Sequence, residues 1–117
     1  MSTSTQIALI GQLEQIVSEW NGLRSRSQHD DVSDLPETEL IRLLTRARAA
    51  IERVSPPNSA YVRQAESILA ETAYSGFHLR GLMGVVQSLI SDLKSGYLQT
   101  VAELIHGELF GDFLERV

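Results

Sequence analysis

The stretch that decides the fold is residues 36–57, PETELIRLLTRARAAIERVSPP. Its apolar residues recur at alternating steps of four and three, which places them on one face of an α-helix. Pro36 suits the first helical turn, Ser33 or Asp34 can cap that turn, and the pair Pro56-Pro57 cannot continue a helix. The sequence therefore predicts a helix that buries Leu40, Leu44, Ala47, Ile51 and Val54, with Leu43 and Ala50 beside them.

The same periodicity predicts a helix on each side of this segment. The first helix runs from about residue 5 to residue 26, and the polar residues 27–33 follow it as a loop. After the two prolines, Asn58 or Ser59 caps a helix that runs to about Tyr74, where Ser75-Gly76 predicts a left-handed stop. The stripe of the first helix is Leu9, Leu13, Ile16, Trp20 and Leu23, and that of the later one is Tyr61, Val62, Ala65, Ile68, Leu69 and Ala73.

The most apolar part of the chain begins at Phe77. Its apolar residues continue at the same helical spacing through Ser95-Gly96, so we expect one long helix with a weak point at Gly96. The alternative is a break at Gly96, which would give five helices. Gly81 and Gly84 lie at helical spacing and predict close approach of a neighbouring helix. The residues expected to form the centre of the core are Trp20, Leu44, Ile51, Ile68, Leu82, Val86 and Leu89.

These patterns predict an all-α fold, an antiparallel bundle of four to five helices with a long C-terminal helix. At 117 residues, we expect residues 1–117 to form a single helical domain, which can also be the N-terminal part of a longer protein.

Composition excludes several classes of function. The chain has no cysteine, which removes disulfide frameworks, thiolate metal sites and cysteine nucleophiles. Its formal net charge of −5 argues against extensive nucleic-acid binding, because that binding needs clustered Lys and Arg. The sequence shows no basic leader pattern and no apolar run of membrane-spanning length. We therefore expect a cytoplasmic protein that needs no membrane and no cofactor.

The end of the chain carries an apolar stripe that runs to the terminal residue. Its members recur at three- and four-residue steps, so on a helix they share one face, and exposed to water they would forgo several kcal/mol, at about 1.5–3 kcal/mol for each side chain. We expect this face to be a protein interface, against the bundle or, preferably, against a second copy in a two-fold dimer. We call this set the C-terminal stripe: Leu109, Phe110, Phe113, Leu114 and Val117.

Two short patterns point to chemistry, each with a structural alternative. Arg24 and His29 fit the Arg-to-His spacing of HEPN-type ribonucleases, in which the Arg steadies phosphate and the His transfers a proton. In a chain with nine Arg and three His such a pair also arises by chance, and this pair lies where a helix runs into a loop. Glu103 and His106 match Glu-x-x-His, the spacing of carboxylate-bridged di-metal bundles, but the pattern occurs once and its neighbours are apolar.

A run of arginines on the 36–54 helix, Arg42, Arg46 and Arg53, lies along one flank. It can bind phosphate or an acidic partner, or form a solvated face whose stems cover apolar surface, which is the interpretation we favour.

Residues 93–98 (LKSGYL), 103–105 (ELI) and 109–114 (LFGDFL) resemble a segment of uncharacterised bacterial proteins. In those proteins a helical N-terminal region precedes a second region similar to HEPN-type domains of defence systems. The resemblance implies that this chain is the non-catalytic N-terminal part of such a protein, and it assigns no active-site residue.

The sequence thus predicts a non-catalytic helical protein-interaction or oligomerisation module, an accessory domain of a bacterial defence or stress protein, with a homodimer as the favoured assembly. The alternatives are a HEPN-like RNA-acting protein using Arg24 and His29, and a metal-binding bundle using Glu103 and His106.

Overall fold

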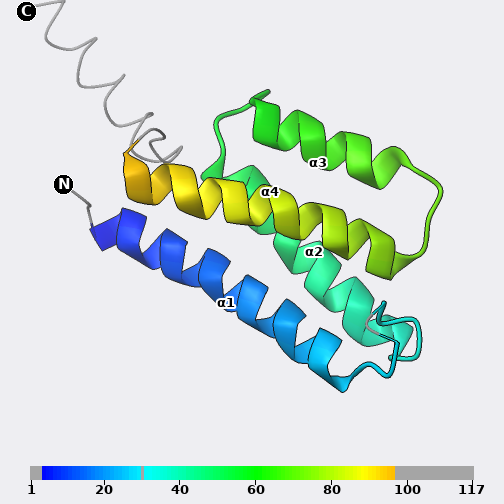
Figure 1. The fold of residues 1–117 in the computed structure, drawn as a ribbon. Helices are drawn as coiled ribbons and strands as arrows, with labels where there is room; N and C mark the ends of the chain where they lie inside the picture. Colours follow the sequence, from blue (N-terminus) through cyan, green and yellow to red (C-terminus); the bar gives the residue numbers. More distant parts are fainter. Residues whose placement is uncertain (1–3, 30, 97–117) are drawn as a thin grey trace, which may run out of the picture.

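The computed structural model describes residues 4–29 and 31–96 and contains in these ranges four α-helices and no strand. They are α1 (Ser4–Arg26), α2 (Glu37–Val54), α3 (Ala60–Ala70) and α4 (Ser75–Ser95). Successive helices run in opposite directions (Figure 1). The all-helical class is thus confirmed.

Helices α2 and α4 form the centre of the bundle, because each of them packs against the other three helices. Helices α1 and α3 lie on opposite flanks of α4 (Figure 1) and make no contact with each other in the described part of the chain. The expectation of an unbroken helix through Gly96 is wrong. Gly96 takes a left-handed conformation at φ 78°, and its N–H bonds back to the carbonyls of Asp92 and Leu93. Helix α4 therefore ends at Ser95 and, with 21 residues, is shorter than α1 with 23.

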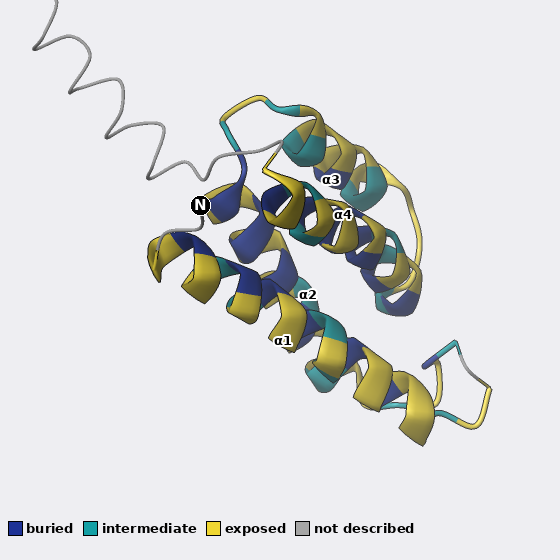
Figure 2. Ribbon diagram, turned by 60° about the vertical axis from the view of Figure 1, so that its left-hand side comes forward, coloured by how far each residue is buried: buried dark blue, intermediate teal, exposed yellow. Residues whose placement is uncertain are grey.

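The core forms where the apolar stripes of the helices meet around α4, and Figure 2 shows the buried residues of each helix turned inward. Five of the residues expected at its centre are buried: Trp20, Ile51, Leu82, Val86 and Leu89. Leu44 and Ile68 are only half-buried and pack against the core from outside. For Ile68 this follows from its place on α3, the helix that contributes least to the core.

The expected capping of α2 by Ser33 or Asp34 is wrong, since the helix begins after Pro36 with no side-chain cap. Asp34 instead closes the α1–α2 loop: it accepts hydrogen bonds from the Ser27 hydroxyl at 2.6 Å and from the backbone N–H of Gln28 at 3.0 Å. The pKa of Asp34 is lowered by these bonds. The polar loop is therefore ordered by its own side chains.

The expected stop at Ser75-Gly76 is also wrong. Helix α3 ends at Ala70, and Ser75 and Gly76 form the first turn of α4. A Cβ on Gly76 would lie 2.8 Å from the Asp31 carbonyl oxygen and 2.8 Å from Val32 Cγ2, so the α1–α2 loop packs directly on the Gly76 backbone. This glycine is needed for close approach and not for a left-handed turn.

Candidate functional site

Helix α3 covers α4 incompletely. Only Ala65 of α3 is buried, while Tyr61, Val62, Ile68 and Leu69 remain half-exposed. With 11 residues, α3 is also the shortest of the four helices. An apolar surface is therefore left open along the line where α3 meets α4.

That surface is a groove formed by two adjoining hollows of about 530 Å³ and about 250 Å³. The two hollows share Gln64, Ile68 and Gly81, so they form one continuous feature, the α3/α4 groove. Helix α3 lines it with Ala60, Tyr61, Gln64, Ser67 and Ile68, and Glu71 lines it just after the end of α3. Helix α4 lines it with Phe77, Arg80, Gly81, Gly84, Val85 and Ser88. Each helix thus contributes a residue at nearly every turn.

Two glycines of α4 form part of this groove and differ in what surrounds them. A Cβ on Gly81 would lie 2.8 Å from Ile68 Cγ2, so Gly81 allows α3 to approach α4, as its spacing predicted. A Cβ on Gly84 would have no atom within 4 Å. A glycine inside a helix costs about 1 kcal/mol relative to alanine, and the packing of the described helices does not require one at Gly84. Gly84 therefore widens the groove without serving the bundle.

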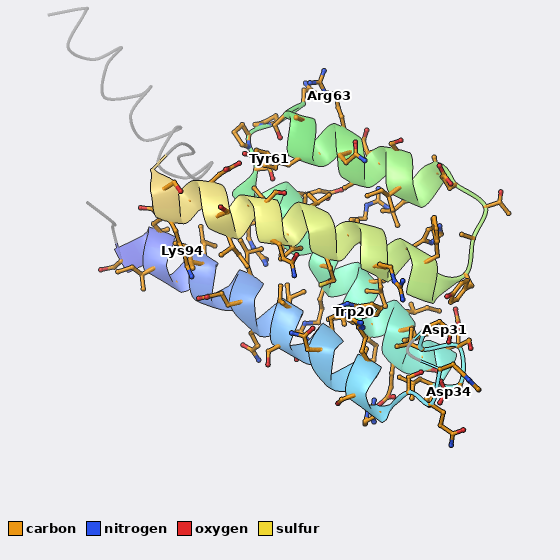
Figure 3. The ribbon with its side chains drawn as sticks, viewed as in Figure 1. Trp20, Asp31, Asp34, Tyr61, Arg63 and Lys94 are labelled. Carbon is orange, nitrogen blue, oxygen red and sulfur yellow. The ribbon has the colours of Figure 1, made fainter. Side chains whose placement is uncertain are left out.

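The two ends of the groove differ in polarity. At the end near Gly96, the Tyr61 hydroxyl donates a hydrogen bond to the Asp92 carboxylate and joins α3 to α4. This bond, with burial and the negative charge of Asp92, raises the pKa of Tyr61 to about 12. Figure 3 shows Tyr61 at the start of α3, beside the end of α4. At the other end the ring of Phe77 is 47% exposed.

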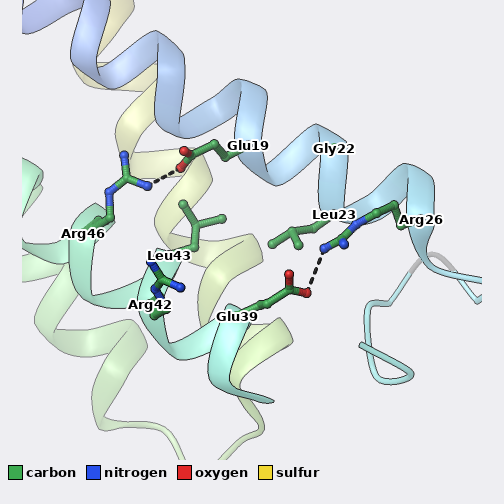
Figure 4. A pocket seen from close by; sticks show the side chains of 8 residues that line it. All are labelled: Glu19, Gly22, Leu23, Arg26, Glu39, Arg42, Leu43 and Arg46. Carbon is green, nitrogen blue, oxygen red and sulfur yellow. Dashed lines mark hydrogen bonds and ion pairs between the residues drawn. The ribbon is translucent and has the colours of Figure 1, made fainter. Parts of the chain in front are cut away.

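A separate hollow of about 400 Å³ lies between α1 and α2, away from the α3/α4 groove, and is lined by charged side chains (Figure 4). Two ion pairs cross it: Arg26 Nη2 lies 2.8 Å from Glu39 Oε2, and Arg46 Nη1 lies 2.5 Å from Glu19 Oε2. Side chains of both pairs are well exposed, so each pair contributes at most about 1 kcal/mol. Arg26 and Arg46 are thus neutralised in place, and Arg42 is the third arginine that lines the hollow. The hollow is best described as a solvated face that joins two helices.

The residues singled out for RNA chemistry are not brought into a cleft. Arg24 lies exposed in the last turn of α1, and His29 lies exposed in the following loop. Neither residue lines a hollow described above. His78 bonds through Nε2 to the Glu71 carbonyl at 2.8 Å.

The remaining candidates, Glu103, His106 and the C-terminal stripe, lie outside the described residues. Within residues 4–29 and 31–96, no group of three or more His, Asp or Glu is placed to hold a metal ion. No helix in the same ranges is both long and apolar enough to cross a membrane.

Sequence reasoning missed the α3/α4 groove. The sequence does contain a trace of the groove: the small residues Gly81, Gly84 and Ser88 recur at three- and four-residue steps on one helix face. This spacing indicates a flat helix surface, but it does not indicate whether a neighbouring helix covers that surface. The three-dimensional arrangement decides this, because Ile68 covers Gly81 while Gly84 stays open.

Comparison of the chain with protein-family models, with curated proteins and with solved structures gives no match. The assignment of a function therefore rests on the geometry of the α3/α4 groove and on the pattern of the C-terminal stripe.

Proposed function

We propose that the chain is a non-catalytic protein-interaction module that forms a two-fold dimer, in which the C-terminal stripe of each copy occupies the α3/α4 groove of the other. The observation that carries the proposal is the open space at Gly84, in a groove that the described helices leave uncovered. The resemblance of residues 93–114 to bacterial defence-associated proteins supports a role as an accessory domain of such a protein.

The chemistry of groove and stripe is complementary. An amphipathic helix that places its apolar face in a groove between two helices is a common mode of protein recognition, with anchors at three- and four-residue steps. The C-terminal stripe has this spacing, and each of its two Phe rings can bury about 150–250 Å². The groove offers apolar side chains from both walls, among them Ile68 and Val85.

Symmetry favours a second copy as the partner. Each chain has one described α3/α4 groove and one C-terminal stripe, so reciprocal docking fills both grooves and buries both stripes in a closed assembly. The four Phe rings of two such contacts can bury about 600–1,000 Å², and the groove surfaces that they cover add to this toward the about 1,200–2,000 Å² that stable complexes bury.

The test is the molar mass of the full chain measured by light scattering over a range of concentrations. We expect a dimer whose dissociation constant rises at least about tenfold, or about 1.4 kcal/mol, in Gly84→Leu, because the new side chain fills the groove. The double change Phe110→Ser with Phe113→Ser should have the same effect from the other side of the interface.

The matched control is Gly11→Leu. Gly11 is an exposed helical glycine, and, as at Gly84, a Cβ added to it would have no atom within 4 Å. Gly11 lies on α1, away from the groove, so this variant should dimerise like the parent. A parent that stays monomeric at every concentration would overturn the proposal, and so would a Gly84→Leu chain that dimerises as tightly as Gly11→Leu.

A further inference from the structure

We infer that the solvated hollow between α1 and α2 is a binding site for a carboxylate, which Arg42 holds from one wall and which enters the space left open at Gly22 on the other. None of the residues that line this hollow lines the α3/α4 groove. The inference therefore goes beyond the proposed dimer and does not depend on it.

The register of the two helices follows from the ion pairs at the ends of the hollow. Glu19 pairs with Arg46 at one end, and Arg26 pairs with Glu39 at the other (Figure 4). On each helix seven residues separate the two pairs (19 to 26 and 39 to 46), which is about two turns. Residues 22–23 of α1 and 42–43 of α2 therefore lie at the level midway between the pairs.

This middle level offers an arginine and no acid. Leu23 and Leu43 are buried beneath the hollow, whereas Gly22 and Arg42 are exposed at its opening. Within residues 4–29 and 31–96, the Arg42 guanidinium forms no ion pair and no hydrogen bond. The levels on either side each match an arginine with a glutamate, so the middle level is the one at which a carboxylate is missing.

Gly22 provides the space for that carboxylate. A Cβ on Gly22 would have no atom within 4 Å, so the packing of the described helices does not require a glycine there. A glycine inside a helix is destabilising relative to alanine. Its place at the level of Arg42 leaves the middle of the hollow, whose volume is about 400 Å³, free for a ligand.

The charge of the hollow selects the ligand. Its lining includes three arginines and two glutamates, which gives a formal net charge of +1 (three minus two). A monovalent carboxylate neutralises this charge, and the Arg42 guanidinium can donate two parallel N–H bonds to its oxygens. A phosphate dianion would leave excess negative charge beside Glu19 and Glu39. The ligand chemistry is thus a carboxylate, carried by a small organic acid or by an acidic side chain of another protein.

The experiment titrates the isotope-labelled full chain with acetate and, in parallel, with sodium chloride at the same ionic strength. Nuclear magnetic resonance follows the backbone N–H of Gly22 and the side-chain Nε–H of Arg26. We expect both signals to move and saturate with acetate, whereas chloride should give no saturating change. Arg42→Gln should weaken acetate binding at least about fivefold, because it removes the charge-assisted bonds to the ligand.

The matched control is Arg63→Gln. Arg63 is an exposed arginine of α3 that lines none of the hollows described above, so this variant should bind acetate like the parent. An equal loss of binding in both variants, or a parent whose signals do not saturate with acetate, would overturn the inference. Tighter binding of inorganic phosphate than of acetate would also overturn it.

A second measurement supplies the carboxylate from within the chain. Gly22→Glu places an acid at the middle level, and Gly22→Gln is its uncharged control of nearly the same size. We expect the melting temperature of the Glu variant, relative to that of the Gln variant, to fall when Arg42→Gln is added to both. Any effect of Arg26, one turn further along α1, is the same in both backgrounds. A relative melting temperature that does not change without Arg42 would contradict the site.

A third titration identifies the source of the carboxylate. An end-blocked tripeptide, Gly-Glu-Gly, presents the acid on a peptide backbone. Tighter binding of the tripeptide than of acetate would support the inferred site with a protein as its ligand. Equal or weaker binding of the tripeptide would support the site with a small acid as its ligand.

Discussion

Val32 packs against the backbone of Gly76, so that Val32 Cγ2 lies 2.8 Å from the position that a Cβ on Gly76 would take. Val32 is fully buried and has a positive φ of 59°, a conformation that is costly for a β-branched residue. Its N–H bonds to the Ser27 hydroxyl oxygen at 3.2 Å. The contact fixes the α1–α2 loop on the first turn of α4 and joins elements more than 40 residues apart in the sequence.

The change Gly76→Ala should therefore destabilise the bundle by about 1–3 kcal/mol, because the added methyl group meets backbone and packed side chains that cannot move away freely. Chemical denaturation followed by circular dichroism gives this free energy of unfolding. Gly11→Ala is the control: it adds the same methyl group to open space and should stabilise its helix by about 0.5–1 kcal/mol. Equal effects of the two changes would show that the loop does not pack on Gly76.

Leu89 is fully buried in the centre of α4. Leu89→Ala should cost about 2–5 kcal/mol, since it removes apolar contacts and leaves a cavity among packed helices. Ile7 is 60% exposed, so the matched change Ile7→Ala should cost less than about 0.5 kcal/mol. A loss of that smaller size at Leu89 would contradict the inward face assigned to α4.

The bond between Tyr61 and Asp92 predicts a dependence of stability on alkaline pH. Because the pKa of Tyr61 is raised from 10.0 to about 12 in the folded protein, the bond contributes fully below pH 10 and its contribution is lost as the pH rises toward 12. At neutral pH, Tyr61→Phe should cost about 1 kcal/mol. The difference in unfolding free energy between parent and variant should shrink above pH 10; a constant difference would contradict the bond.

The α1–α2 loop predicts a dependence on acid. The backbone and side-chain hydrogen bonds from Ser33 lower the pKa of Asp31, and those from Ser27 and Gln28 lower the pKa of Asp34, both from 3.8. Their contribution is present above pH 3.8 and is lost as the pH falls through the lowered values. In Asp31→Asn with Asp34→Asn, the part of the acid destabilisation that comes from the loop should disappear. A variant whose stability falls with acid as steeply as that of the parent would contradict this role.

The parts of the fold that could be predicted from sequence are those governed by local periodicity. The helix at residues 37–54 was predicted almost to the residue, because an apolar stripe, a proline at its start and two prolines after its end all act within the segment. The buried positions of Trp20, Leu82 and Val86 followed from the same periodicity.

The errors occurred where a distant contact decides the local structure. Ser75-Gly76 has the composition of a helix stop, but the loop at Val32 packs on this glycine and allows a helix to begin there. Asp34 has the composition of a helix cap, but Ser27 and Gln28 use both of its oxygens. The α3/α4 groove was missed for a related reason, since the open space at Gly84 depends on how closely α3 approaches α4 at that turn.

The single tryptophan, Trp20, gives the protein an optical signal that reports on folding alone. Its indole ring is buried on α1, a helix that makes no contact with α3 in the described ranges. Unfolding brings the ring into water and shifts its fluorescence to longer wavelengths, whereas a segment that enters or leaves the α3/α4 groove acts on the opposite flank of α4. Tryptophan emission can therefore be recorded during a dimerisation titration as an internal standard: an unchanged spectrum certifies that a loss of mass is dissociation and not denaturation.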